Sequence, residues 1–433
     1  MLVSILCEGG RLLREAQEQH QQALNGLSPA DRALAEQIVR TTLRRRGQLE
    51  HMLKRFLNKP LPRKACPVHA ALLMGAAQLL AMRVPAHAAI HTTVALLKHE
   101  RHLGHFSGLA NAVLRRLHAE GEMLLRQVDA ALNIPEWLRQ RWRQAWGEEA
   151  LREMVQMLLA EPPLDITVHD AETAAAWAER LHGTLLPTGS VRIMHPQGPV
   201  PELPGYDEGA WWVQDAAAAL PAHLLAAAFP QADISGRSIA DLCAAPGGKT
   251  AQLVSRGARV QAVDISARRL RRLHENLKRL KLADKVEVVE ADVLQWHPAT
   301  APDAILLDAP CTATGTFRRH PDVLQAKSPA QLAALAELQR QMLQHAAHQI
   351  APGGVLVYCV CSLLPEEGEE QVERFLASKA GQAFRRLPVS PAEIAHQHQF
   401  ITAAGDVRTL PHQPIGSSTG LDGFFIARLQ RTE

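Results

Sequence analysis

The first part of the chain shows apolar residues at helical spacing and no strand-like alternation. Residues 12–23 place apolar side chains on one face, and the pattern resumes at 33–43 after the cap signal Ser28-Pro29. Further runs with the same period follow at 67–82, 86–99 and 107–117. The pattern therefore predicts an all-α domain over residues 1–132.

The pattern changes twice between residues 133 and 232. Residues 133–162 predict two short helices, of which the first begins near Pro135 and ends at Gly147. The segment 164–209 is rich in Pro and Gly and carries short strand-like pieces at 165–168 and 191–194. We expect a small α+β subdomain here that links the first domain to the next.

From residue 238 onward, short apolar runs alternate with helical segments. The predicted strands are 238–242, 259–263, 286–290, 304–307 and 355–359, and one intervening helix, 268–281, is strongly basic. This alternation predicts a doubly wound, mostly parallel sheet whose ligand lies at the carboxyl ends of the strands. Residues 423–429 form a final strand, which we expect at the edge of the sheet. Residues 233–433 should therefore form an α/β, Rossmann-like domain.

Composition excludes several classes of protein. The 433 residues are 47% hydrophobic and 21% charged, which is typical of a soluble multi-domain protein and not of a disordered one. The longest apolar stretch, 70–82, is too short to span a bilayer, and residues 1–10 lack the basic start of a signal peptide. Six scattered cysteines without a C-x-x-C pair favour reduced thiols in the cytoplasm over a disulfide framework or a zinc site.

The net charge of +3 does not identify a partner, but basic residues cluster locally. Nine lysines and arginines and a single acid, Glu50, lie between positions 40 and 64. The cluster is either a solvated helix face or a nucleic-acid footprint. The second interpretation gains weight only if the other domain acts on RNA or DNA.

The most informative stretch reads S-I-A-D-L-C-A-A-P-G-G-K-T over residues 238–250: an apolar run, a tight turn of small residues, then a helix. Gly247 and Gly248 allow close backbone approach and positive φ, and the helix directs free N–H groups and its positive dipole end at a ligand. A phosphate-binding P-loop would need glycine in place of Cys243, and a dinucleotide site would need a third glycine. S-adenosylmethionine has no pyrophosphate and tolerates this looser pattern.

Acidic residues follow three of the predicted strands. Asp264, Asp292 and Asp308 each stand at a strand end, where a carboxylate can accept hydrogen bonds from ribose or adenine. One such residue would be an ordinary turn residue. Three at successive strand ends favour a nucleoside site, and we therefore expect S-adenosylmethionine as the cofactor.

Two cysteines at neighbouring strand ends narrow the reaction. Cys311 lies in D-A-P-C-T-A-T-G (308–315), and Cys361 follows the fifth strand. Carbon 5 of a pyrimidine is a poor nucleophile, but a thiolate that adds at carbon 6 activates it, and expulsion of the thiolate completes the cycle. Asp308 can stabilise the adduct, and Lys249 is a candidate for the positive charge that keeps the thiol ionised. Buried structural cysteines are the simpler alternative, which this combination disfavours.

These motifs resemble those of the RNA cytosine carbon-5 methyltransferase (NOL/NSUN) family. The resemblance covers roughly residues 135–429 and rests on D-L-C-A-A-P-G-G-K-T (241–250), D-A-P-C-x-x-x-G (308–315) and C-S-L-L-P-E-E (361–367). The helical first domain resembles the NusB-like RNA-binding fold. Together they imply a class I S-adenosylmethionine-dependent methyltransferase domain that acts in the cytoplasm on a cytosine of 16S rRNA, cytosine 967. The implied substrate is 16S rRNA or a small-subunit assembly intermediate, with no membrane and no metal.

The resemblance also implies a role for each residue of this sequence that matches a functional residue of the family motifs. Cys361 is the implied nucleophile, Cys311 the residue that assists product release, and Asp308 the residue that contacts the cytosine. The resemblance assigns S-adenosylmethionine to Cys243, Ala244, Ala245, Pro246, Gly247, Gly248 and Lys249, and to Asp264, Asp292 and Asp308.

The sequence departs from the family pattern in places. Val360 stands where the family has Thr before the nucleophile, and Thr167-Val168-His169 replaces the usual R-V-N. Cys359 is an extra thiol, and strand alternation puts it on the same side as Cys361. The Ser-Leu-Leu-Pro run after Cys361 favours Cys361 as the nucleophile.

Two alternatives belong to other classes. A NusB-like RNA-binding protein with an inactive second domain would bind RNA but not S-adenosylmethionine, and the intact motif at 241–250 argues against it. An NAD-dependent oxidoreductase is disfavoured by the incomplete glycine pattern and by the two cysteines.

Overall fold

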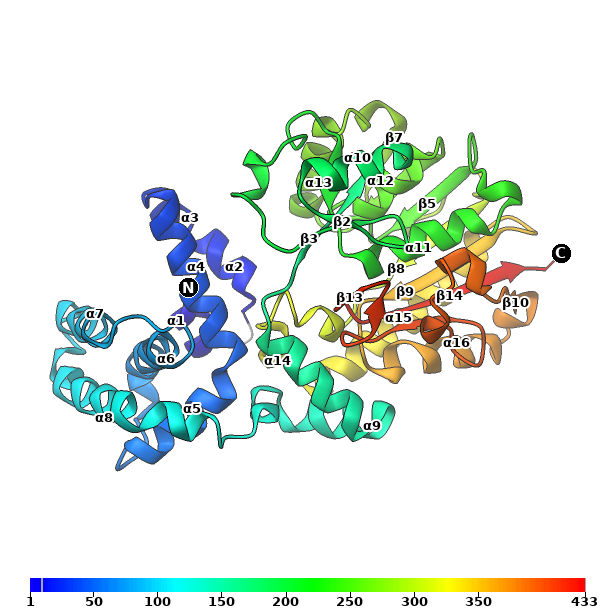
Figure 1. Ribbon diagram of the computed structural model, residues 1–433. Helices are drawn as coiled ribbons and strands as arrows, with labels where there is room; N and C mark the ends of the chain where they lie inside the picture. Colours follow the sequence, from blue (N-terminus) through cyan, green and yellow to red (C-terminus); the bar gives the residue numbers. More distant parts are fainter. Residues whose placement is uncertain (9–10, 433) are drawn as a thin grey trace. The chain divides into compact units, whose positions relative to one another are not determined.

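The structure, a computed structural model, describes residues 1–8 and 11–432. The chain divides into two compact units, of which the first comprises Met1–Ala160 and Phe317–Ser328 and the second Glu161–Thr316 and Pro329–Glu433 (Figure 1). Each unit has its own hydrophobic core.

The described residues of the first unit form helices and no strands. Its α-helices are α1 (Leu2–Cys7), α2 (Leu13–Gln19), α3 (Gln21–Asn25), α4 (Pro29–Arg44), α5 (Arg46–Phe56), α6 (Cys66–Leu80), α7 (Ala86–His99), α8 (Ser107–Leu125), α9 (Glu136–Leu159) and α14 (Val323–Ala326). Leu49, Leu72 and Leu114 are fully buried where α5, α6 and α8 pack together. The all-α prediction is confirmed for the described residues of this unit.

Helix α9 is two helices joined at a kink. Gly147 has φ +84°, a left-handed conformation that glycine adopts without a Cβ penalty, so it ends the first helix as the sequence predicts. Trp142 is fully buried, and its ring lies 5.5 Å from that of Phe317. This tryptophan is therefore part of the core and does not stack on a ligand.

One expectation about the cysteines is wrong. Cys7, the last residue of α1, forms a disulfide with Cys66, the first residue of α6, and their Cα atoms are 5.8 Å apart. The two residues are 59 positions apart, and only the packing of α1 on α6 brings them together. The other four cysteines, all in the second unit, are free thiols.

The basic cluster at 40–64 is not one solvated surface. Arg44 is only 9% exposed and donates to the carbonyl of Leu158, and Arg40 donates to the carbonyl of Arg319. Both arginines hold parts of the first unit together, and the burial of Arg44 keeps it from solvent. The exposed members of the cluster are Lys54, Arg55, Lys59, Arg63 and Lys64.

The second unit is built on a mostly parallel sheet. Strands β5 (Ser238–Leu242), β6 (Arg259–Asp264), β7 (Val286–Glu290), β8 (Ala304–Asp308) and β9 (Val355–Val360) are joined in parallel in the order β9-β8-β5-β6-β7. All five predicted strands are confirmed. The chain reverses its direction of sheet growth beside β5, which is where doubly wound folds bind ligands.

The last strand, β14 (Phe424–Arg431), is not at the edge as expected. It pairs antiparallel with β9 on one side and with β10 (Phe384–Arg386) and β11 (Val407–Thr409) on the other. Its residues Phe424 to Leu429 are all buried. Two short segments that carry no strong strand signal therefore cover an edge that would otherwise be open.

Helices cover both faces of this sheet. Figure 1 shows α11 (Ala216–Ala227), α12 (Gly248–Ser255) and α13 (Ala267–Arg279) on one side, and α15 (Pro329–Gln349) and α16 (Glu369–Leu376) on the other. The strand residues alternate between two cores: Leu306 packs toward α11, whereas Ile305 and Leu307 pack toward α15. Alternation along each strand thus supplies both faces.

A smaller antiparallel sheet precedes the large one in the second unit. It contains β1 (Leu164–Val168), β2 (Thr184–Leu185), β3 (Val191–Ile193) and β4 (Trp211–Val213), with α10 (Ala174–Arg180) against it. A buried bidentate ion pair joins Arg192 to Asp165 at 2.7 Å for both bonds, and Asp165 also accepts from the backbone N–H of Ala216 at the start of α11. This network fixes the small sheet to the larger core.

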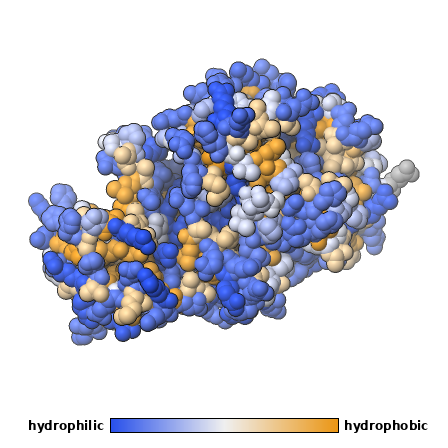
Figure 2. Space-filling view, in the orientation of Figure 1, coloured by the Kyte–Doolittle hydropathy of each residue, from blue (hydrophilic) through white to orange (hydrophobic). Residues whose placement is uncertain are grey.

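Among the described residues, no helix is long and apolar enough to cross a membrane. Figure 2 shows a largely hydrophilic face with scattered hydrophobic residues.

Candidate active site

The site begins at the turn between β5 and α12. Cys243 (φ +62°) and Gly247 (φ +98°) are both left-handed, and a Cβ on Gly247 would lie 3.0 Å from the side chain of Leu273. The Thr250 hydroxyl donates to the Asp241 carboxylate at 2.6 Å, which ties the first turn of α12 to β5. The N–H groups of that turn have no partner within the helix and face the carboxyl ends of the strands.

Two of the acids expected at strand ends follow β6 and β7, and one of them, Asp264, contacts this turn. Asp264, at the end of β6, is 1% exposed and accepts from the backbone N–H groups of Ala245 (3.2 Å) and Ser266 (3.0 Å). Asp292 is half-buried after β7 and accepts from Leu294 N–H at 2.9 Å through one oxygen. Asp264 also pairs with Arg269 at 3.4 Å. A carboxylate has about four acceptor positions, so Asp264 retains about one and Asp292 retains more for hydroxyl or amino groups of a ligand.

Asp308, at the end of β8, is held by two donors. Lys249 Nζ lies 2.7 Å from one carboxylate oxygen, and the Cys359 thiol donates to the other at 3.5 Å. Burial disfavours the charged form of Lys249, but its acidic neighbours, Asp308 foremost, together outweigh burial and raise the lysine pKa. Lys249 also lies over the Phe424 ring at 5.3 Å. The described contacts of Lys249 do not include Cys361. The lysine charge that we expected beside the Cys361 thiol lies beside the Asp308 carboxylate instead.

The two cysteines of interest meet. Cys311 Sγ lies 3.5 Å from Cys361 Sγ, and both residues are half-buried. The hydrogen bond shared with the Cys361 sulfur, together with burial, raises the Cys311 pKa well above its ordinary value. Either sulfur can be the donor in the pair. Burial also raises the pKa of Cys243, which keeps that thiol protonated and makes it a poor nucleophile.

A residue without a predicted role connects the two cysteine loops. The Glu367 carboxylate is fully buried and accepts four hydrogen bonds. They come from Thr312 N–H (2.8 Å), Thr312 Oγ1 (2.5 Å), Ser362 Oγ (2.5 Å) and Gln339 Nε2 (3.0 Å). Thr312 follows Cys311 and Ser362 follows Cys361, so this one carboxylate holds both loops. The P-E-E letters were visible in the sequence, but only the fold shows what the second Glu contacts.

Glycine at the end of the 308–315 motif has a steric cause. A Cβ on Gly315 would lie 1.9 Å from the carbonyl oxygen of Gly423. Gly315 N–H donates to the carbonyl of Cys361 at 2.9 Å, and Gly423 N–H donates to the carbonyl of Gly315 at 2.9 Å. The loop that carries Cys311 is thus pinned to the chain around Cys361 by backbone contacts that a larger residue would block.

Comparison with known proteins places this arrangement in a family. Residues 231–430 match the family described as 16S rRNA methyltransferase RsmB/F, and residues 4–119 match the NusB family. Ribosomal RNA small subunit methyltransferase B of Cronobacter sakazakii is 35% identical over 417 residues, which cover 93% of this chain and 91% of that protein. The protein of the same name in Xanthomonas campestris is 37% identical over 424 residues, or 94% and 91% of the two chains.

The chain belongs to the RsmB/F family of 16S rRNA methyltransferases. Solved structures agree on the fold of this RsmB/F chain: PH0851 has a TM-score of 0.74 at 22% identity and covers 96% of this chain and 93% of its own. NSun6 from Pyrococcus horikoshii has a TM-score of 0.55 at 21% identity, over 69% of this chain and 98% of its own.

S-adenosylmethionine is the methyl donor of the RsmB/F family. The residues at the β5 turn fit this molecule, because they combine a left-handed glycine with acceptor positions on Asp264 and Asp292. In the described part of the chain, no group of three or more His, Cys, Asp or Glu side chains is arranged to hold a metal ion.

Proposed function

We propose that this enzyme methylates carbon 5 of a cytosine in 16S rRNA and that Cys361 forms a covalent adduct at carbon 6 of the ring. The observation that carries the proposal is the pair of cysteine sulfurs 3.5 Å apart. They follow the ends of β8 and β9, and Asp308 at the end of β8 pairs with Lys249 of α12. Simple methyl transfer to a nitrogen or oxygen would need no pair of thiols. S-adenosylmethionine supplies the electrophilic methyl group.

The two cysteines have different roles in this mechanism. The Cys361 sulfur adds to carbon 6 as a thiolate. Cys311 Sγ lies 3.5 Å from Cys361 Sγ, so its S–H can donate to that thiolate. After methyl transfer, a base removes the carbon-5 proton and the electron pair of that bond expels the Cys361 thiolate. The Cys311 thiol stabilises the departing thiolate, which is consistent with its raised pKa. Loss of Cys311 should thus hinder release more than attack.

Asp308 is proposed to contact the cytosine ring. Its carboxylate is 30% exposed, and Lys249 and Cys359 hold its orientation without covering it. A fixed charge beside the ring costs no reorganisation when the adduct forms. Lys249 acts through Asp308 and is a positioning residue in this scheme.

Three cysteine variants test the mechanism with a radiolabelled methyl donor and a 16S rRNA fragment. Cys361→Ala should abolish methyl transfer while calorimetry still detects cofactor binding. Cys311→Ala should accumulate a protein–RNA adduct that survives denaturation. Cys359→Ala in the Cys311→Ala background is the matched control, because it removes a thiol two residues from the nucleophile and the adduct should still accumulate. Absence of any adduct with Cys311→Ala would refute the two-cysteine mechanism.

The target nucleotide and the state of the substrate are separate proposals. The family resemblance favours cytosine 967, in naked 16S rRNA or in a cytoplasmic small-subunit assembly intermediate. A buried thiol can reach only a base that has left its stack, so we expect an unpaired or flipped nucleotide. Bisulfite sequencing of rRNA from cells that lack this protein should show one cytosine that becomes unprotected. Identical bisulfite patterns in cells with and without the protein would contradict the proposal.

A further inference from the structure

Three buried side chains with polar groups link the small antiparallel sheet to α12, the helix that follows the glycine turn of the cofactor site. Trp212 lies in β4, Gln214 follows that strand, and Gln252 lies in α12. They are 5%, 7% and 8% exposed, so their polar groups must find partners inside the protein.

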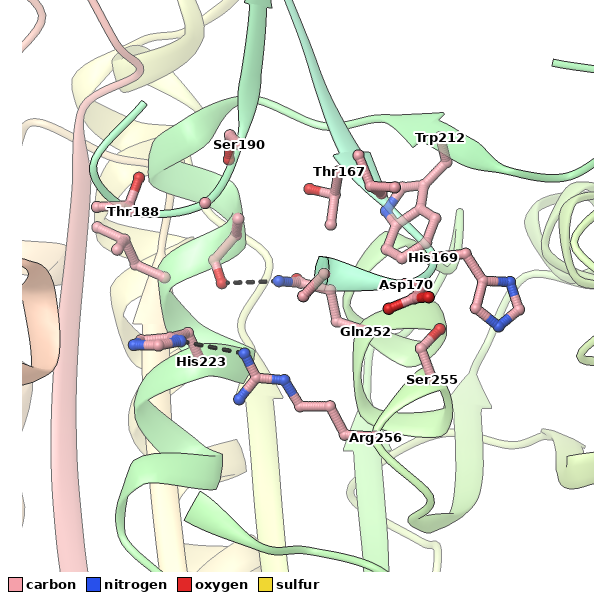
Figure 3. Close-up of a pocket in the computed structure, with 15 residues that line it drawn as sticks. Thr167, His169, Asp170, Thr188, Ser190, Trp212, His223, Gln252, Ser255 and Arg256 are labelled. Carbon is pink, nitrogen blue, oxygen red and sulfur yellow. Dashed lines mark hydrogen bonds between the residues drawn. The ribbon is translucent and has the colours of Figure 1, made fainter. Parts of the chain in front are cut away.

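Hydrogen bonds join these side chains in series. Trp212 Nε1 donates to Gln214 Oε1 at 2.9 Å, and Gln214 Nε2 donates to Gln252 Oε1 at 2.8 Å. Gln252 Nε2 donates in turn to the carbonyl of Ala219 in α11 at 3.1 Å (Figure 3). Gln214 Nε2 also donates to the carbonyl of Ala218 at 3.1 Å. Each glutamine amide therefore has a partner for its oxygen and for its nitrogen.

The two ends of the series fix the orientation of both amides. An indole N–H can only donate, and a backbone carbonyl can only accept. Gln214 must therefore turn its oxygen to Trp212, and Gln252 must turn its nitrogen to α11. The nitrogen of Gln214 then faces the oxygen of Gln252, as it does in the structure. A glutamate at position 214 would keep the shape of the side chain but could not donate to its neighbours.

Helix α12 depends on such contacts for its orientation. It has only eight residues (Gly248–Ser255), and isolated helices of this length are not stable on their own in water. Thr250 joins one side of the helix to Asp241 of β5. Gln252 lies two residues further on, which is about 200° around the helix axis and thus on the opposite side. The two side chains therefore hold α12 from both sides.

The same series lies against the start of the helix. A Cβ on Gly248 would lie 3.5 Å from Gln214 Nε2 and 3.6 Å from Trp212 Nε1, which is ordinary van der Waals contact. Gly248 is the first residue of α12 and the last residue of the motif that the family assigns to the cofactor before the lysine. A shift of Trp212 or Gln214 would therefore reach the N–H groups of the first turn of α12.

We propose that Trp212 and Gln214 are positioning residues for S-adenosylmethionine. They hold the first turn of α12 in the orientation that binds the methyl donor, and they act through this helix and not as contacts of the cofactor. The small sheet, for which the sequence predicts only a linking role, thus supports the cofactor site. The proposal uses the cofactor of the family and does not depend on the roles of the cysteines.

The test is calorimetric titration of the full chain with S-adenosylmethionine. Gln214→Glu should raise the dissociation constant about tenfold, because it turns an acceptor toward the carbonyl of Ala218 and toward Gln252. Trp212→Phe should raise it about three- to tenfold, because the oxygen of Gln214 loses its buried donor. This smaller change decides the question if Gln214→Glu does not fold.

Trp211→Phe is the matched control for Trp212→Phe. Trp211 is fully buried in the neighbouring position, and its indole N–H donates to the carbonyl of Pro204 at 2.9 Å, so the same substitution again removes one hydrogen bond. Alternation along β4 puts the two rings on opposite faces. Trp211 belongs to the core of the small sheet, and Trp212 belongs to the core that includes α11 and α12.

We expect both tryptophan variants to lower the melting midpoint, and only Trp212→Phe to weaken cofactor binding. Equal effects of the two variants on the dissociation constant, whether both weaken binding or neither does, would overturn the proposal. So would a folded Gln214→Glu variant that binds the cofactor as tightly as the native protein. Cofactor binding is the readout, and Cys361→Ala is expected to retain it, so failure here is separable from failure of the cysteine mechanism.

Discussion

Glu367 provides the sharpest test of how the cysteine loops are held. The perturbation is Glu367→Ala, compared with Glu367→Gln. In the native structure each carboxylate oxygen accepts two hydrogen bonds, which fills its capacity of about four. Gln can keep one oxygen toward the Thr312 N–H and turn its amide toward the hydroxyls of Thr312 and Ser362, since hydroxyls can also accept.

The magnitude follows from the donors that Ala leaves behind. The hydroxyls of Thr312 and Ser362 lie 3.2 Å apart and can pair with each other, and Gln339 Nε2 already donates to Pro310 at 2.9 Å. The Thr312 N–H has no such substitute, and a void remains beside it. We expect Glu367→Ala to lower the free energy of unfolding by about 3–5 kcal/mol and Glu367→Gln by about 1–2 kcal/mol. For a unit of this size, the larger loss lowers the melting midpoint by about 6–20 °C.

The assay must report the distance between the sulfurs as well as stability. Mild oxidation with diamide should link Cys311 to Cys361 in the native protein, because the sulfurs are already 3.5 Å apart. Mass spectrometry of the digested protein measures the rate at which the linked peptide appears. That rate should fall about tenfold or more in Glu367→Ala, because misplacement by about 1 Å is enough to disrupt such geometry, and should change little in Glu367→Gln. If the Ala variant melts and cross-links like the native protein, Glu367 does not position the cysteines.

Two further predictions concern pH and RNA binding. Burial raises the pKa of Asp241 to about 7 from its ordinary 3.8, so the folded protein favours the neutral carboxyl. The contribution of this carboxyl to the free energy of unfolding is complete below about pH 4 and is lost as the pH rises through 7. The melting temperature of Asp241→Asn should therefore rise relative to that of the native protein as the pH increases from about 4 to about 8. A difference in melting temperature that does not depend on pH would contradict this. Reversing the charges of Lys59, Arg63 and Lys64 should reduce the salt slope of rRNA binding by about 2–3, whereas Arg126→Gln should not; equal slopes would make the cluster ordinary surface.

The strands of the second unit could be predicted almost residue by residue. Buried parallel strands read as short apolar runs, and β5, β8 and β9 do so. The edge strand β7 has two glutamates and no buried residue, and its valines carry the signal. The position of β14 could not be predicted, because its neighbour β10 is a three-residue strand paired over a long loop. The disulfide was missed for the same reason: two helix ends far apart in sequence meet only after packing. Arg44 is buried although its neighbours in the basic stretch are exposed or half-buried, and no feature of the nearby sequence distinguishes it from them.

The site shows where local pattern stops being sufficient. Residues 359 and 361 lie on the same side of β9 by alternation, so the sequence offers two thiols for one role. Cys359 is fully buried, lies opposite Asp308 in the strand register and donates to its carboxylate; burial raises its pKa. Cys361 lies one residue past the end of β9, where it is half-buried and touches Cys311. In the proposed mechanism the nucleophile must be reachable and must leave as a thiolate, which favours the second position over the first. Cys359 instead donates to one carboxylate oxygen of Asp308 while Lys249 donates to the other. The proposal therefore gives positioning to the buried thiol inside β9 and attack to the half-buried thiol just past its end.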